Sequence, residues 1–174
     1  MRHGKWLSIP IVFFLVFLTS NSKVYPGNPD DVASLRGLWV MSVLVESLPP
    51  DIEGKGLTKE QIQTDVELKL RLAGIKVFSD EEWVAIPRSP YLYVNAHVMV
   101  KRDIRLAVYN IDIELRQWVI LERDPKIKII ATTWDIGYLG SIGSDQIGDI
   151  RNSIKALVDI FINGFLSVNP KGGK

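Results

Sequence analysis

The feature that most constrains the fold of this chain is a long alternation of apolar and polar side chains over residues 105–122. A period of two residues is typical of a β-strand that packs one face on a core and exposes the other. A strand of this length is expected to be bent or bulged. The apolar side carries Tyr109, Ile111, Ile113, Leu115, Val119 and Leu121, and the polar side carries Asn110, Asp112, Glu114 and Arg116. The chain is therefore expected to form a sheet with one polar face.

Two neighbouring segments extend this strand into a sheet. Residues 91–100 alternate with the same period, and residues 127–134 follow as a third strand. The breaks at 101–103 and 123–126 have the length of hairpin connections. The three segments are therefore predicted to pair as an antiparallel meander.

Residues 57–74 carry a full set of helix signals. Thr58 is placed to cap the helix while Gln61 reaches back to the start, and Leu57 and Ile62 occupy staple positions. A glycine closes the segment, and glycine takes the left-handed conformation that commonly ends a helix. These signals predict one helix with an apolar stripe that packs on the sheet.

Two apolar segments, 38–46 and 75–78, flank this helix and are predicted to be parallel neighbours joined by a crossover. A second long helix is expected over 145–168, capped by Ser144 or Asp145, because apolar residues recur there at helical spacing. The predicted architecture is an α+β fold in the order strand, helix, four strands, helix. It has a sheet of about five strands, mixed but mostly antiparallel, with both helices packed on one face.

The amino-terminal segment has the composition of a secretory leader. Arg2 and Lys5 precede the apolar run 6–18, and Ser20 and Ser22 have the spacing that a signal peptidase needs. Residues 1–22 are therefore predicted to be a signal peptide, with an uncleaved anchor as the alternative. The expected location is periplasmic or secreted.

The remaining chain is divided by composition. Residues 23–36 have the proline, glycine and asparagine content of a flexible linker, residues 37–169 form one domain, and residues 170–174 form a disordered tail. Removing residues 1–22 takes away two basic residues and no acidic one, so the formal net charge of +1 becomes about −1. A near-neutral domain has no general attraction for nucleic acid, and contact with a membrane is expected only through an uncleaved leader.

Few residues suggest catalysis or metal binding. The chain has no cysteine, which excludes disulfides and thiolate chemistry, and His97 is the single histidine outside the predicted leader. We therefore expect no cofactor and no metal site. Asp112 and Glu114 share one strand face at a spacing of roughly 6–7 Å, within which a carboxylate pair could hydrolyse a glycan. The alternative is that Arg116 and other basic residues pair with them as a solvated, charged face.

Aromatic side chains on the polar face suggest a binding surface instead. Tyr91 and Tyr93 point away from the valines of their strand. In the next strand, Trp118 alternates in step with the residues of the polar face. Such a face could bind a glycan strand or a partner protein, or could be covered by the loop around Trp83. The candidate binding residues are Tyr91, Tyr93, His97, Arg116, Trp118 and Tyr138.

The glycine-rich stretch WDIGYLGSIGSDQIGDI, residues 134–150, invites comparison with phosphate-binding loops. Its spacing differs from the dinucleotide fingerprint, and Asp145 and Asp149 would repel a phosphate at the start of the following helix. The predicted interpretation is a connection between strand and helix. Two alternatives remain: residues 138–142 extend the last strand, or the segment is a contact surface, which is why Tyr138 is a candidate.

The order of elements, with the first helix ending in LRLAGIKVFSDEEW, resembles small α+β domains of bacterial envelope proteins. The similar domains are the amino-terminal domain of TolB and curli-secretion-type periplasmic domains. The resemblance implies a non-catalytic role in envelope assembly or interaction, with an envelope protein or polymer as partner and no catalytic residue to carry over. The competing hypotheses are a glycan hydrolase that uses Asp112 and Glu114, and a purely structural domain.

Overall fold

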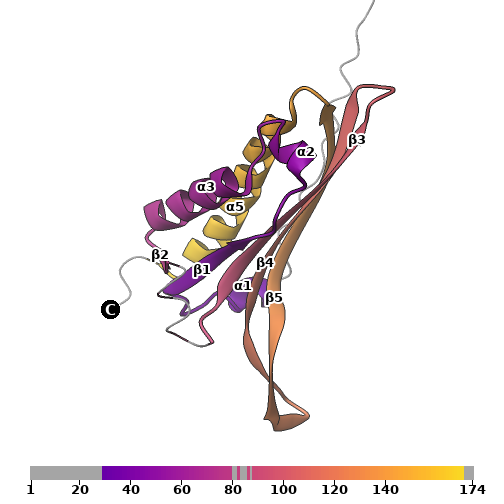
Figure 1. Ribbon diagram of the computed structural model, residues 1–174. Helices are drawn as coiled ribbons and strands as arrows, with labels where there is room; N and C mark the ends of the chain where they lie inside the picture. The colour runs from indigo at the N-terminus through magenta and orange to yellow at the C-terminus, as the bar shows by residue number, and fades with distance from the viewer. Residues whose placement is uncertain (1–28, 80–81, 83–85, 87, 171–174) are drawn as a thin grey trace, which may run out of the picture.

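The computed structural model describes residues 29–79, 82, 86 and 88–170. The described residues form one five-stranded sheet, with α3 and α5 packed side by side on one face, so the predicted α+β fold is confirmed (Figure 1). The elements are α1 (Pro29–Ala33), β1 (Val40–Val45), α2 (Pro50–Glu53), α3 (Lys59–Leu72), β2 (Lys76–Val77), β3 (Tyr91–Lys101), β4 (Leu106–Leu121), β5 (Asp124–Gly143), the 3-10 helix η1 (Ile147–Asp149) and α5 (Ile150–Val168).

The strands lie in the order β2-β1-β3-β4-β5. β1 pairs in parallel with β2, as predicted for two strands joined by a crossover, and also in parallel with β3, while β3, β4 and β5 form the predicted antiparallel meander. The register places Tyr93 opposite Glu114 and Leu92 opposite Leu115. Because directly opposite residues point to the same side of a sheet, every strand contributes one row to each face.

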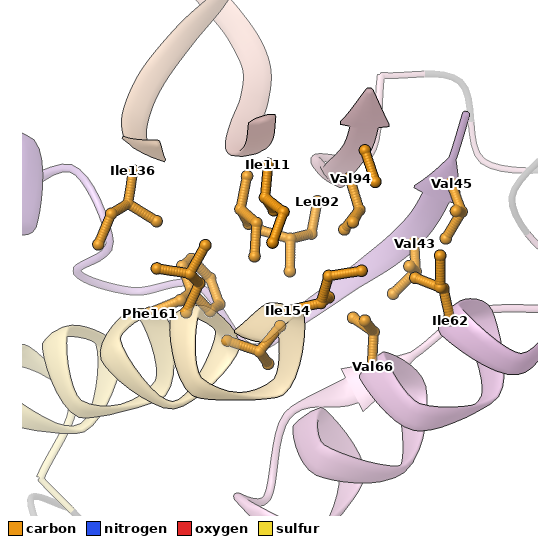
Figure 2. Close-up of a cluster of buried hydrophobic side chains, with 14 of the residues drawn as sticks. Val43, Val45, Ile62, Val66, Leu92, Val94, Ile111, Ile136, Ile154 and Phe161 are labelled. Atoms are coloured by element: carbon orange, nitrogen blue, oxygen red, sulfur yellow. The ribbon is translucent and has the colours of Figure 1, made fainter. Parts of the chain in front are cut away.

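The core lies between the sheet and the two long helices. Figure 2 shows side chains of β1, β3 and β4 pointing toward those of α3 and α5. Trp134 on β5 meets the ring of Phe161 on α5 edge-on, with centroids 5.0 Å apart. Each large apolar side chain removed from water in this way contributes about 1.5–3 kcal/mol. The apolar face of the sheet therefore holds the helices in place.

The ends of α3 follow the sequence signals. The Thr58 side chain accepts a hydrogen bond from the backbone N–H of Gln61, and the Gln61 side chain accepts one from the N–H of Thr58. At the other end Gly74 has a φ of +89°, and the N–H of Ile75 donates to the carbonyl of Leu70. These bonds satisfy backbone groups that a helix end leaves unpaired.

The meander is longer and more irregular than two plain hairpins. The β4–β5 register shifts between Leu115 and Arg116 and again between Ile120 and Leu121, so the predicted irregularity of the long strand is confirmed. Beyond the first shift, the hairpin of β4 and β5 extends past the ends of the helices (Figure 1). Its residues therefore receive little cover from α3 and α5.

The glycine-rich segment is not a connection, and this prediction was wrong. β5 continues to Gly143, which confirms the alternative that residues 138–142 extend the strand. A Cβ atom at residue 140 would lie 2.6 Å from the ring of Tyr109 and 2.8 Å from that of Tyr138, so any other residue there would have to displace the tyrosine rings that cover the backbone. The predicted helix start was also wrong: η1 comes first, and α5 begins at Ile150 without a side-chain cap from Ser144 or Asp145.

The amino-terminal boundary also differs from the expectation. Of the segment 23–36, expected to be a linker, the described part contains α1, and Leu35 is fully buried in the core. The Ser34 hydroxyl bonds to the carbonyl of Thr133 on β5, at 3.0 Å. These residues are therefore packed on the domain. The predicted signal peptide, residues 1–22, lies outside the described residues, as do residues 171–174 of the tail.

Candidate functional site

The strongest candidate site lies on the face of the sheet opposite α3 and α5. Alternate residues of β3 and β4 point to this side, and the antiparallel register brings Tyr91 opposite Arg116 and Tyr93 opposite Glu114. The backbone N–H of Glu46, just after β1, donates to the carbonyl of Val94 and brings that acid beside Tyr93. We call these five residues, Glu46, Tyr91, Tyr93, Glu114 and Arg116, the open-face cluster.

Arg116 is the centre of the open-face cluster. Its guanidinium lies 4.0 Å from the centre of the Tyr93 ring, and its Nε donates to Glu114 Oε2 at 2.8 Å. The Thr132 hydroxyl on β5 donates to the same carboxylate oxygen at 2.7 Å, and the Tyr93 hydroxyl donates to Glu46 at 2.8 Å. A cation above an aromatic face adds about 0.5–1 kcal/mol at an exposed site. Contacts from β3, β4, β5 and the residue after β1 thus hold the cluster in one arrangement.

The protonation states follow from these contacts. The hydrogen bond from Arg116 holds the pKa of Glu114 below its ordinary value, although partial burial opposes it. The same bond raises the pKa of Arg116. Burial, followed by the hydrogen bond to Glu46, raises the pKa of Tyr93. At neutral pH the cluster is therefore an ionised pair stacked on a neutral phenol.

These contacts weaken the case for a carboxylate pair. Glu114 is already bonded to Arg116 and Thr132, and its lowered pKa keeps it ionised, so it is a poor proton donor to a leaving group. Asp112 accepts a hydrogen bond from the side chain of Asn110 at 2.6 Å. The two acids share one strand face, as the sequence predicted; Glu114 is charge-paired with Arg116, as in the alternative interpretation, whereas Asp112 bonds to the neutral amide of Asn110.

Apolar side chains continue the open face along the extended hairpin. Trp118 lies opposite Ile130, and the guanidinium of Arg88 lies 5.4 Å from the centre of its ring. Trp118 is 40% exposed, Ile120 59% and Ile130 47%, a high exposure for large apolar groups that lie together. Clustered exposed apolar residues tend to mark interaction sites. The open-face cluster and this apolar extension form one continuous strip.

Two predicted binding residues lie away from this strip. His97 is on the same face but lies opposite Asn110, toward the other end of β3, beside a hollow of about 300 Å³ that Met99 and Leu139 also line. Tyr138 belongs to the helix-covered face, where its ring lies 6.0 Å from that of Tyr109. The structure therefore brings together Tyr91, Tyr93, Arg116 and Trp118, and separates His97 and Tyr138 from them. Trp83 lies outside the described residues.

Several members of the strip had no signal in the sequence. Glu46, and Thr132 as the partner of Glu114, are brought in by the register of β1 with β3 and of β4 with β5, which local patterns do not reveal. Ile120 and Ile130 are exposed because the hairpin extends past the helices. Their apolar character was visible in the sequence, but apolar side chains usually predict burial, so nothing in the sequence indicated that they would be exposed.

The described residues contain neither a metal-binding cluster nor a helix that could span a membrane. Within the described ranges, no three histidine, aspartate or glutamate side chains gather closely enough to hold a metal ion. No helix in that part of the chain is long and apolar enough to cross a membrane.

No protein-family model matches the chain, and no curated protein matches it. Among solved structures, the dodecamer of a single-substitution variant of PelC from Paraburkholderia phytofirmans has a TM-score of 0.42 at 18% identity, covering 72% of this chain and 88% of that chain. The PelC dodecamer from the same organism in another crystal form has a TM-score of 0.41 at 17% identity, covering 73% and 88%. Likeness at this level supports no conclusion about function.

Proposed function

We propose that the protein is an exported, non-catalytic binding module of the bacterial cell envelope. The contact surface is the strip formed by the open-face cluster and the apolar extension, and the partner is an envelope protein or polymer. One observation carries the proposal: Arg116 is fixed on the Tyr93 ring while Trp118, Ile120 and Ile130 remain exposed beside it. The envelope setting rests on the leader-like sequence 1–22 and on the resemblance to TolB-type domains.

The chemistry of the strip suits recognition. Tyrosine, tryptophan and arginine are the residues that most often dominate binding energy at interfaces, and an anchor held in place loses little entropy on binding. Aromatic faces also stack on the apolar faces of sugar rings, so a glycan strand and a protein are both suitable partners. Within the strip, Glu114 and Arg116 compensate each other's charge.

The test is capture of a partner by the full chain. Immobilised protein is exposed to envelope extract and, separately, to purified cell-wall glycan, and bound material is quantified. Trp118→Ala and Tyr93→Ala are expected to reduce capture at least about tenfold, as anchors at an interface do. Leu72→Ala is the matched control, because Leu72 is 75% exposed but lies on α3, on the other side of the sheet.

The capture experiment has separate results for a correct and an incorrect surface. Loss of protein capture, of glycan capture or of both in the strip variants, with normal capture by the control, supports the proposal and identifies the partner class. Thermal unfolding confirms that each variant is folded. Normal capture by folded Trp118→Ala and Tyr93→Ala variants would refute the proposed surface.

A further inference from the structure

The outer edge of β5 is protected along one half and unprotected along the other. β5 is the last strand of the sheet, and within the described ranges no other strand pairs with its outer edge. The hairpin half carries Pro125, Lys126 and Lys128, and the register is irregular near Thr133, whose carbonyl bonds to Ser34. Proline, lysine, irregular register and covering segments are the usual protections of an edge strand. Residues 136–143 have neither a charge nor a proline, and their register is regular.

An apolar hollow lies beside this unprotected edge. It has a volume of about 250 Å³, lies between β5 and α5, and is lined by Tyr138, Ser153, Ala156, Leu157 and Ile160. The Ser153 hydroxyl is already paired with the hydroxyl of Tyr109, at 3.1 Å. A free strand edge next to an apolar pocket is the arrangement that binds an added β-strand.

Two of the three charged side chains of α5 pair with α3. Arg151 pairs with Asp65 at 2.7 Å, and Asp159 pairs with Lys69, so both bridges join α5 to α3. The α5 residues that line the hollow carry no charge. A segment that enters the hollow from the β5 side would meet these uncharged side chains, which favour a neutral strand over a charged one.

We propose that the strand added here is residues 136–143 of a second copy of the chain, so that two sheets join edge to edge about a two-fold axis. The segment is self-complementary when it pairs antiparallel around Gly140. Gly137 then lies opposite Gly143 of the partner subunit, Tyr138 opposite the partner's Ile142, and Leu139 opposite the partner's Ser141. Each pair occurs twice, as a two-fold interface requires. The pairing of Tyr138 with the partner's Ile142 places an aromatic side chain opposite a β-branched one, which is a favourable cross-strand combination.

The self-pairing also accounts for an exposed leucine. Leu139 is 71% exposed, on the face opposite the helices. Around the proposed axis it lies diagonal to the partner's Leu139, within the roughly 7–8 Å at which long side chains touch. The two open faces become one continuous surface. Glycine at the axis keeps side chains out of the closest approach of the two backbones.

The test is the mass of the full chain in solution, measured by sedimentation equilibrium over a range of concentrations. The expected mass is that of a dimer. Leu139→Lys, at an exposed position where folding is unaffected, places two like charges near the axis and should weaken dimerisation at least about tenfold. Leu72→Lys on α3, at a comparably exposed leucine, is the matched control and should remain dimeric.

A second measurement locates the contact. The chain has no cysteine, so the double variant Leu139→Cys, Ser141→Cys adds the only two thiols. Residues 139 and 141 of one strand are too far apart to bridge each other, whereas opposite positions of two strands come within disulfide range. Mild oxidation should therefore give a covalent dimer. A monomeric wild-type chain, a Leu139→Lys variant as dimeric as the control, or failure of the double variant to cross-link would overturn the proposal.

Discussion

The two faces of the β3–β4 pair are built from the same strands and serve different purposes. Leu92, Val94, Ile111 and Ile113 point toward the helices and are fully buried. The residues that alternate with them along the strands, among them Tyr93 and Glu114, point the other way and remain half-exposed. The first set lowers the free energy of the fold by leaving water. The second set is organised by hydrogen bonds and ring stacking, which hold side chains in place without covering them.

This contrast has a consequence for mutation. A substitution on the covered face is expected to change the free energy of unfolding, whereas one on the open face is expected to change binding and leave stability nearly unaltered. Stability measurements on variants of each region test this difference.

The largest effect is expected from Ile113→Ala, at a fully buried position of β4. Loss of a buried isoleucine leaves a cavity, so the free energy of unfolding should fall by about 2–5 kcal/mol. Urea denaturation measures the change. Ile129→Ala, at a 41% exposed position of the hairpin, is the control and should cost far less. Equal losses would mean that the hairpin is as well packed as the core, and the contrast would fail.

Gly140→Ala tests whether the covered face requires glycine there. The added methyl group would meet the rings of Tyr109 and Tyr138, and overpacking of this kind typically costs about 1–3 kcal/mol. Gly137→Ala is the matched control on the open face, where the nearest atom, an Asp112 oxygen, lies 3.3 Å away. Thermal unfolding should rank the first variant below the second. The reverse order would show that the tyrosines move aside freely.

Thr58→Ala removes one half of the capping box of α3 and leaves both faces of the sheet intact. The expected loss is about 1 kcal/mol, measured by urea denaturation. Thr64→Ala, on the same helix, serves as control because the Thr64 hydroxyl bonds only to the carbonyl of Glu60 within the described interactions. A loss no greater than that of the control would show that the cap contributes little to stability.

Glu114→Gln is expected to have the smallest effect, because partly exposed ion pairs contribute about 1 kcal/mol or less. The folded pKa of Glu114 lies below its unfolded value, so the ion pair stabilises the fold above an unfolded pKa of about 4.3. That contribution is lost as the pH falls through the folded pKa. The difference between wild type and variant should therefore be greatest near neutrality and vanish in acid. A difference that grows on acidification would contradict the assigned pairing.

Much of the covered face could be predicted from the sequence. The alternation over 105–122 identified the buried row of β4, and the helical spacing of apolar residues identified the stripe of α5, from Ile150 to Phe165. The capping signals at Thr58 and Gly74 were confirmed as well. All these signals act between residues a few positions apart, so each segment carries its own information.

The open face and the edge depended on contacts between distant segments. Glu46 and Tyr93 are 47 residues apart in sequence, and Glu114 and Thr132 are 18 apart. Residues 136–143 have the glycine content of a connection, but the regular edge of β4 provided backbone partners, and the Tyr109 ring occupied the space above Gly140. Periodicity specified which side chains face water. Which of these side chains meet was decided only by the strand register, by its two shifts, and by the length over which the hairpin extends past the helices. All three depend on pairing across the sheet.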